Sequence, residues 1–251
     1  MNILVAIPVY NEARHVAGVL REVRRYAENI LVVDDGSTDG TGEALADFEN
    51  IRVIRHQVNL GYGRALINAF RCALCCGMDW IITLDCDGQH EPAVIPRFIE
   101  VAAADECDIV SGSRYLPNAP ADASPPAARR RINTEITALV NETLGLDLTD
   151  AFCGFKAYRV SALKPLNLTE HGYAMPMQLW VRAARAGLRI REIPVRLIYN
   201  DPDRTFGGPL DDPGYRKRHY LRVFYNALAD DDDSGWIRCE CGGRSLVACR
   251  C

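Results

Sequence analysis

The 251-residue sequence lacks any run of about 18 to 20 consecutive apolar residues, the length that a bilayer-spanning helix needs. It also lacks a basic region before its first apolar run at 3–7 and a small-residue cleavage site after it, so we expect a core strand there and not a signal peptide. An excess of positive charge is missing too, because the formal net charge is −4, which argues against a nucleic-acid partner. These absences predict a cytoplasmic protein without a transmembrane segment, and they leave peripheral attachment to a membrane open.

Two kinds of glycine-rich, phosphate-binding motif are also absent. The stretch Gly61-Tyr62-Gly63-Arg64 has Leu66 where a dinucleotide fingerprint has its third glycine, and it does not follow the first predicted strand. No Walker A lysine loop occurs in the sequence. A Rossmann dehydrogenase is therefore disfavoured.

Ten cysteines are present, and they fall into two groups. Six lie within predicted helices or strands, as expected of small core residues: Cys72, Cys75, Cys76, Cys86, Cys107 and Cys153. The other four form two C-x-C pairs near the end of the sequence: Cys239, Cys241, Cys249 and Cys251. Four thiolates can bind zinc, but this spacing differs from the usual one, so we favour an incidental, unstructured tail.

The first 112 residues alternate between short apolar runs and helical periodicity. Strands are predicted at 3–7, 30–33, 52–55, 80–84 and 108–112. Helices are predicted between them, at about 16–23, 40–48, 66–74 and 94–102. Such alternation is typical of an α/β fold, so we predict a doubly wound, mostly parallel sheet with helices on both faces.

The second half is less regular. Residues 117–128 contain four prolines and are predicted to form a mobile loop or linker. Further along we expect a helix over 132–144, a turn at 154–155, a helix around 177–186, a strand over 190–199 and a helix over 221–228. We therefore predict a single domain over 1–228, followed by an acidic, Cys-rich, disordered tail at 229–251.

Polar residues follow three of the predicted strands. They are Pro8, Tyr10, Asn11 and Glu12 after the first, Asp34 and Asp35 after the second, and Asp85, Asp87, Gln89 and His90 after the fourth. In open α/β sheets, ligands bind beyond the carboxyl ends of the strands, so these side chains should converge in one crevice.

Asp85 and Asp87 are one residue apart where a strand becomes a loop, so both carboxylates should project the same way. Two carboxylates can share Mg²⁺ or Mn²⁺, which then binds a diphosphate and acts as a Lewis acid on a leaving group. A solvated acidic turn is the alternative for an isolated D-x-D. The position after a buried strand, beside two other polar strand ends, favours the metal site.

The other polar strand ends have structural interpretations beside the ligand-binding ones. Asp34 or Asp35 could form a turn or cap a helix while the other accepts a hydrogen bond from a ribose or base. Tyr10 could stack on a base or line the core, and Asn11 could cap the first helix.

Together these motifs resemble family 2 glycosyltransferases of the GT-A fold, especially the branch of polyprenyl- and dolichyl-phosphate mannosyltransferases. The resemblance spans about residues 3–200. Its strings are IPVYNE (7–12), VVDDGSTDGT (32–41), NLGYGRAL (59–66), LDCDGQHEP (84–92), SGSRY (111–115), DAFCGFKAYR (150–159) and, less closely, 172–195. It implies a GT-A-type sheet, with a nucleotide-sugar-binding half at 1–112 and an acceptor half at 113–228. It further implies inverting transfer from a GDP- or UDP-sugar.

The resemblance also implies roles for individual residues. The nucleotide-sugar pocket would be formed by Pro8, Tyr10, Asn11, Glu12, Val33, Asp35, Asp85, Cys86 and Gln89. The metal ligands would be Asp85, Asp87 and Gln89, and the catalytic group would comprise Asp87, Asp150, Arg114 and Arg204. Arg114 would approach the sugar or phosphate, although a surface ion pair is its alternative. Asp150 would be the general base for a hydroxyl acceptor, or else a structural turn residue.

Two departures from the family pattern concern the acceptor. Gln178 stands where relatives usually carry an acid, and the loop that contains Arg204 lacks the usual Ser-Lys. A polyprenyl phosphate is the favoured acceptor, and Arg130, Arg131 and Arg204 would then clamp its phosphate. A soluble or protein hydroxyl is an alternative acceptor. A non-catalytic nucleotide-sugar-binding protein is the remaining hypothesis.

Overall fold

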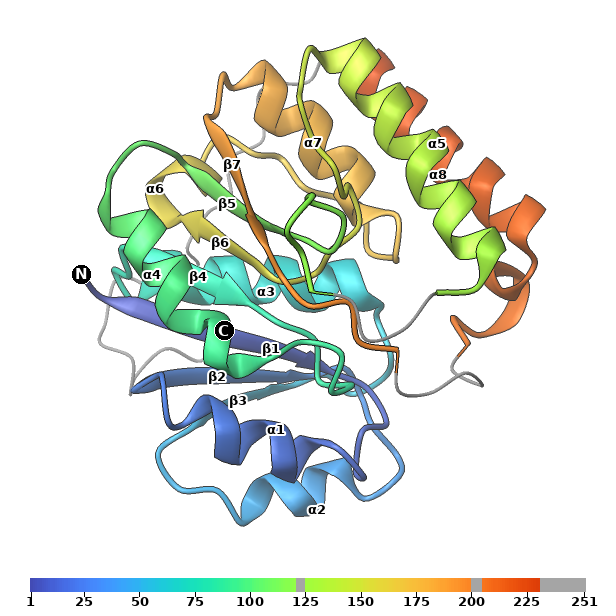
Figure 1. Ribbon diagram of the computed structural model, residues 1–251. Coiled ribbons are helices and arrows are strands. Elements are labelled where there is room, and N and C mark those ends of the chain that lie inside the picture. The colour runs from blue at the N-terminus through green and yellow to red at the C-terminus, as the bar shows by residue number, and fades with distance from the viewer. Residues whose placement is uncertain (121–124, 200–204, 231–251) are drawn as a thin grey trace.

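The computed structural model describes residues 1–120, 125–199 and 205–230. A seven-stranded sheet of order β3-β2-β1-β4-β6-β5-β7 runs through them, between helices on both sides (Figure 1). Its strands are β1 (Ile3–Val9), β2 (Asn29–Asp34), β3 (Arg52–Arg55), β4 (Trp80–Thr83), β5 (Ile109–Ser113), β6 (Lys156–Arg159) and β7 (Ile190–Pro194).

Strand pairing is parallel except at one strand. β1 pairs in parallel with β2 and β4, β2 with β3, and β5 with β7. Only β6 runs antiparallel to its neighbours β4 and β5 within the described part of the chain. The predicted doubly wound, mostly parallel sheet is therefore confirmed.

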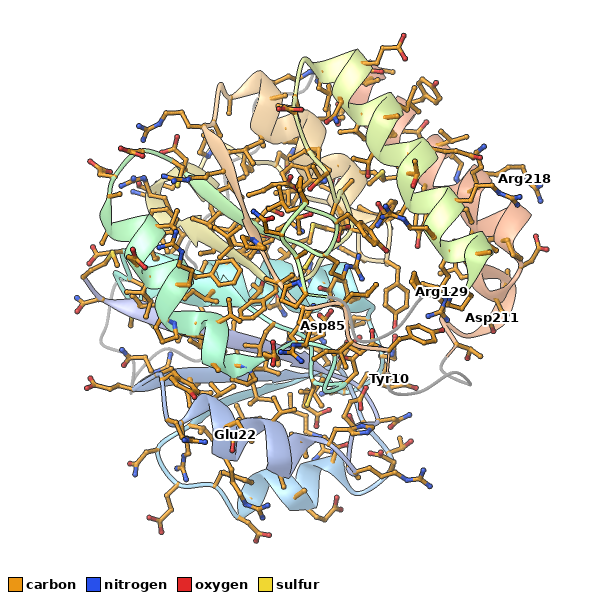
Figure 2. The ribbon with its side chains drawn as sticks, viewed as in Figure 1. Tyr10, Glu22, Asp85, Arg129, Asp211 and Arg218 are labelled. Atoms are coloured by element: carbon orange, nitrogen blue, oxygen red, sulfur yellow. The ribbon has the colours of Figure 1, made fainter. Side chains whose placement is uncertain are left out.

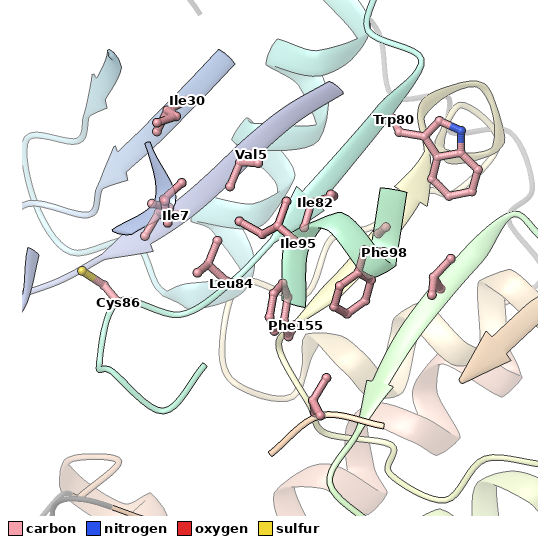
Figure 3. Close-up of a cluster of buried hydrophobic side chains, with 14 of the residues drawn as sticks. Val5, Ile7, Ile30, Trp80, Ile82, Leu84, Cys86, Ile95, Phe98 and Phe155 are labelled. Carbon is pink, nitrogen blue, oxygen red and sulfur yellow. The ribbon is translucent and has the colours of Figure 1, made fainter. Parts of the chain in front are cut away.

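Alternation along β1 sends its side chains to opposite faces of the sheet. Val5 and Ile7 face a core that also contains Phe98 and Phe155 (Figure 3). The helices over this face are α1 (Val16–Val23), α2 (Thr41–Ala46) and α4 (Ile95–Ala103), which follows the short 3₁₀ helix η1 (Pro92–Val94).

Leu4 and Ala6 of β1 face a second core on the opposite side, around Phe70. It is covered by α3 (Tyr62–Cys75), α6 (Val160–Leu163) and α7 (Met175–Arg185). A third cluster forms around Trp180, where α7 packs against α5 (Ala127–Leu144) and α8 (Pro213–Ala229). Figure 1 shows α5 and α8 side by side, and the 3₁₀ helix η2 (Gly208–Asp211) leads into α8.

Several predicted boundaries in the second half were wrong, and proline explains most of them. α8 begins at Pro213 and not near 221, because proline suits the first position of a helix. α5 begins at Ala127, directly after Pro126, so the predicted loop ends two residues early. β7 ends at Pro194, which cannot donate to a sheet ladder, and not at residue 199. β6 was not predicted.

Some predictions lie outside what the structure describes. They are the role of Arg204 and the disordered tail, of which residues 231–251 are not described. The division into two halves at residue 112 stays a prediction. Within the described residues, no helix is both long and apolar enough to cross a bilayer.

Candidate active site

A pocket of about 330 Å³ opens beyond the carboxyl ends of β1, β2 and β4. One end carries Tyr10 and Asp85, which follow strands, and the other carries residues of α5 and α8, among them Arg129 (Figure 2). The pocket therefore lies between the sheet edge and the α5–α8 layer. This is where an open α/β sheet is expected to bind its ligand.

Most predicted site residues line this pocket: Pro8, Tyr10, Glu12, Asp35, Asp85, Cys86, Asp87, Gln89 and Arg114. Val33, Asn11 and Asp150 do not belong to its lining. Val33 is fully buried and belongs to the core beneath the sheet edge. Because Val33 has no exposed surface and does not line the pocket, its predicted contact with the nucleotide is not favoured.

Asn11 connects two strand ends and does not cap α1. Its backbone N–H donates to Ser37 Oγ (2.9 Å), and its side-chain oxygen accepts from Thr38 N (2.8 Å). Its φ of 55° is the left-handed conformation that asparagine tolerates. α1 instead starts after His15, whose side chain makes no capping bond. The capping role predicted for Asn11 was therefore wrong.

The two aspartates at the end of β2 have different contacts. Asp34 Oδ1 accepts from Ser37 N (2.9 Å), which closes the turn. Asp35 reaches the pocket, where its carboxylate accepts from Leu60 N and Gly61 N, both at 2.8 Å. The Asp35 carboxylate therefore fixes the Gly-Tyr-Gly loop against the strand end.

Asp85 is held at the pocket by one bond to its side chain and one from its backbone. Tyr62 Oη donates to Asp85 Oδ1 (3.0 Å), and the backbone N–H of Asp85 donates to His90 Nδ1 (2.9 Å). Gly154 lies so close that a Cβ there would be 2.5 Å from Asp85 Oδ2. Asp87 Oδ1 in turn accepts from Gln89 N (3.0 Å), so the loop after β4 orients both carboxylates.

The electrostatics of this pair suit a divalent cation. Burial raises the pKa of Asp85, and the charge of Asp87 adds to this against the opposing influence of His90. Added positive charge would relieve that penalty. Among the described residues, no three His, Cys, Asp or Glu side chains gather into a preformed metal cage. Mg²⁺ commonly binds one or two carboxylates and takes its remaining ligands from water and substrate phosphates. The Asp85–Asp87 pair therefore fits such an ion.

Arg114 and Asp150 form a two-bond ion pair at the pocket wall. Arg114 Nε donates to Asp150 Oδ2 (2.7 Å), and Arg114 Nη2 donates to Asp150 Oδ1 (3.0 Å). Asn133 Nδ2 also donates to Oδ1 (2.8 Å), and Asp150 is fully buried. Burial alone would raise the pKa of Asp150, but Arg114 and Asn133 outweigh it and lower the pKa to about 2. Such a carboxylate is a poor proton acceptor, so its contacts favour a positioning role over the predicted base.

Replacing Asp150 with asparagine should destabilise the fold by about 3 kcal/mol at neutral pH, because it leaves the Arg114 guanidinium poorly paired. The folded-state pKa of Asp150 lies below the unfolded value of 3.8, so this stabilisation is present above pH 3.8 and is lost as pH falls toward 2. Urea unfolding between pH 7 and pH 2 checks this, with the exposed Asp147→Asn as the control. If the difference in free energy of unfolding between the native chain and Asp150→Asn stays the same in acid, the ion-pair assignment is contradicted.

Aromatic and basic residues that were not predicted extend from Tyr62, beside Asp85, to the α5–α8 end of the pocket. Tyr62 stacks on Tyr173 with ring centroids 5.6 Å apart, and the Tyr173 ring meets Phe206 edge-on at 5.5 Å. The guanidiniums of Arg129 and Arg216 lie 4.9 Å and 4.8 Å from the centre of the Phe206 ring. These residues come from separate segments, so no local sequence pattern joins them.

Only one member of the basic triplet at the start of α5 lines the pocket. Arg129 lines the pocket, whereas Arg130 and Arg131 are exposed and outside its lining. Arg130 stacks on Tyr115 at 3.4 Å, and Arg131 Nε lies 3.9 Å from Glu135. The predicted phosphate clamp of Arg130 and Arg131 is therefore not favoured, and Arg129 is the member of the triplet that faces the pocket.

Gln178, which replaces an acid of the family pattern, lies outside the pocket lining. Its side-chain oxygen accepts from Thr169 N and Glu170 N, both at 2.8 Å, and its Nε2 donates to Thr169 Oγ1. The amide thus stabilises the loop before α7.

Comparison with known proteins gives consistent results. Residues 4–166 match the family described as Glycosyl transferase family 2. The undecaprenyl-phosphate mannosyltransferase of Micrococcus luteus is 34% identical over 207 residues, which cover 79% of this chain and 84% of that protein. The polyprenol monophosphomannose synthase of Mycolicibacterium smegmatis is 31% identical over 202 residues, 76% of each chain.

Solved structures share the fold. Glucosyl-3-phosphoglycerate synthase from Mycobacterium tuberculosis, in complex with Mn²⁺, uridine diphosphate and glucosyl-3-phosphoglycerate, superposes with a TM-score of 0.68. The match covers 92% of this chain and 81% of that one, at 20% identity. The predicted GT-A-type architecture is thereby confirmed.

Proposed function

The chain belongs to glycosyl transferase family 2 and is a glycosyltransferase, and from that premise we propose its substrates and mechanism. It transfers a sugar from a GDP- or UDP-sugar to a polyprenyl phosphate, with inversion at the anomeric carbon and dependence on Mg²⁺ or Mn²⁺. The observation that carries this proposal is a single pocket with the Asp85–Asp87 pair at one end and Arg129 and Arg216 at the other. The carboxylate pair would bind the donor diphosphate through the cation, and the two arginines would bind the acceptor phosphate.

The donor end is supported by the residues that follow β1, β2 and β4. Tyr10 lines the pocket and is 45% exposed, so its ring is available to stack on a base. Asp85 and Asp87 would hold the divalent cation, which supplies Lewis-acid stabilisation of the departing diphosphate when it is bound. Arg114, oriented by Asp150, donates to charge that develops on the leaving group.

The acceptor end favours a phosphate over a hydroxyl. Among the described residues that line the pocket, the carboxylates are Glu12, Asp35, Asp85 and Asp87, and all four follow strands at the donor end. A hydroxyl acceptor needs a base near its proton. A phosphate acceptor is already ionised: its oxygen forms the new bond to the anomeric carbon while the bond to the nucleoside diphosphate breaks. No strong base is then required, which agrees with the low pKa of Asp150.

The alternative hypotheses are less well supported. The non-catalytic binding protein depended on Gln178, whose contacts are structural. A soluble or protein hydroxyl acceptor would need a base that the acceptor end does not offer among its described residues. The names of both curated relatives refer to polyprenyl acceptors. Because such an acceptor resides in a bilayer, we place the chain at a membrane surface, as a peripheral cytoplasmic enzyme.

A donor screen tests this function. The chain would be incubated with Mn²⁺, undecaprenyl phosphate and one of GDP-mannose, UDP-glucose or UDP-N-acetylglucosamine, and the organic phase would be analysed for a glycolipid. We expect one donor to give a glycolipid, and EDTA to abolish its formation. Tight donor binding without transfer or hydrolysis would support the non-catalytic alternative, and transfer only to hydroxyl compounds would support the second acceptor class.

A further inference from the structure

His56 is a buried residue near the pocket that the proposed mechanism does not use. It follows β3 directly, as Asp35 follows β2, and these two strands pair in parallel with Asp34 opposite Arg55. The next residues along the two strands therefore lie side by side. The backbone N–H of Asp35 donates to the Val9 carbonyl oxygen (2.8 Å), and that of His56 donates to the Asp34 carbonyl oxygen (2.9 Å), so the sheet fixes both backbones.

The side chain of His56 has two partners, one at each ring nitrogen. His56 Nδ1 lies 2.6 Å from Asp35 Oδ1, and Asn68 Nδ2, which comes from α3, lies 2.8 Å from His56 Nε2. An amide nitrogen can only donate, so Nε2 accepts this bond and the ring hydrogen is on Nδ1. Asn68 therefore selects the tautomer of His56 that donates to Asp35.

Three donors converge on the Asp35 carboxylate. Oδ1 accepts from His56 Nδ1 and from Leu60 N (2.8 Å), and Oδ2 accepts from Gly61 N (2.8 Å). The two oxygens of a carboxylate offer about four acceptor positions, so one position of Oδ2 is left. The side chain of Asp35 is 4% exposed and lines the pocket. It can therefore offer a ligand one hydrogen-bond acceptor, held in a fixed direction by its buried partners.

We propose that His56 is a positioning residue, which orients the Asp35 carboxylate so that Oδ2 accepts one hydrogen bond from the nucleoside of the sugar donor. Tyr10 follows the neighbouring strand β1, lines the same pocket and has an exposed ring. A nucleoside beside it would therefore have one stacking partner and one hydrogen-bonding partner. The identity of the ligand as a sugar donor rests on the proposed function.

Calorimetric titration of the full chain with Mn²⁺ compares a nucleoside diphosphate with inorganic pyrophosphate, which lacks the nucleoside. UDP and GDP are titrated first, and the one that binds the native chain more tightly is used with the variants. His56→Leu removes the ring donor, so it should weaken nucleoside diphosphate binding by about tenfold or more, as expected for a lost hydrogen bond to a charged group. Pyrophosphate binding should not change, whereas a general loss of structure would weaken both ligands alike.

Two further variants make the comparison specific. His56→Asn places an amide N–H near the position of Nδ1, so it should restore most of the nucleoside diphosphate affinity. Gln57→Leu is the matched control, because it introduces the same leucine at an exposed neighbouring position outside the pocket lining, and it should change neither affinity. In turnover, His56→Leu should raise the KM for the donor more than it lowers kcat, because it removes a contact made before and during the reaction.

The positioning role is wrong if His56→Leu weakens both ligands equally or neither of them, if His56→Asn binds as poorly as His56→Leu, or if the native chain binds neither UDP nor GDP. If His56→Leu does not fold, Asn68→Leu replaces it in the test. Asn68 is only half-buried, and losing its amide releases the tautomer of His56, so only nucleoside diphosphate binding should fall. A chain that shows His56-dependent nucleoside diphosphate binding but transfers no sugar would refute the transfer reaction and not the positioning role.

Discussion

Sugar transfer by the Asp87→Ala variant is expected to be slower by about a thousandfold, the magnitude lost when a key electrostatic group is removed from an active site. Asp87 is one of the two carboxylates proposed to bind the cation, and no group of three His, Cys, Asp or Glu side chains among the described residues could hold the ion in its place. The side chain lies at the pocket and not in a core, so the melting temperature should change little. Initial rates of glycolipid formation in saturating Mn²⁺ measure the effect.

Asp47→Ala is the matched control, because Asp47 is an exposed aspartate at the end of α2. It should transfer sugar like the native chain. Activity of Asp87→Ala within a few-fold of native would remove this carboxylate from the metal site and leave Asp85 without its partner.

A methyl group at residue 154 is expected to impair catalysis by about 100-fold, because misplacing a catalytic group by about 1 Å can cost that much. In Gly154→Ala the new Cβ would lie 2.5 Å from Asp85 Oδ2 and 2.9 Å from Tyr62 Oη. The atoms that must move are the ends of side chains, so the carboxylate shifts while the backbone stays. Stability should therefore fall only modestly, and the loss should appear in the metal-dependent rate.

Gly18→Ala is the control for the glycine change itself. Gly18 lies inside α1, and a Cβ there has no atom within 4 Å. Alanine favours helix, so this variant should gain up to about 1 kcal/mol of stability and keep full activity. If Gly154→Ala transfers sugar as fast as Gly18→Ala, then the position of Asp85 does not govern the reaction.

The donor end of the pocket was readable from the sequence because its residues are local to strand ends. An apolar run such as 80–84 marks a buried strand, and the acidic pair that follows must then lie at the sheet edge. The same logic located β1 and β2 and their polar ends. Val33 belongs to the core and not to the pocket lining, because family motifs include core positions beside pocket positions.

Strand β6 could not be predicted because its sequence, KAYR, is neither an apolar run nor an alternation of apolar and polar residues. Lys156 is 2% exposed, a burial that no periodicity rule assigns to lysine. Its amine donates to the Cys153 carbonyl oxygen and faces the Trp180 ring, so tertiary contacts satisfy it. The insertion of β6 between β4 and β5 likewise depends on long-range pairing.

The acceptor end could not be predicted because it is assembled from distant segments. Tyr173, Phe206 and Arg216 meet only when α7, η2 and α8 pack together. The environment of Asp150 depends on the same packing, since Asn133 reaches it from α5. A motif placed Asp150 near the chemistry, but only its contacts indicate that it orients Arg114.

We propose that Asp85 and Asp87 bind a divalent cation together with the donor diphosphate. The most direct test measures nucleoside diphosphate affinity by calorimetry with Mn²⁺ and with EDTA, in the native chain and in Asp87→Ala. Mn²⁺ should tighten binding to the native chain by about tenfold or more, equivalent to about 1.4 kcal/mol or more, and should have little effect on the variant. An equal Mn²⁺ effect in both chains, or none in the native chain, would contradict it.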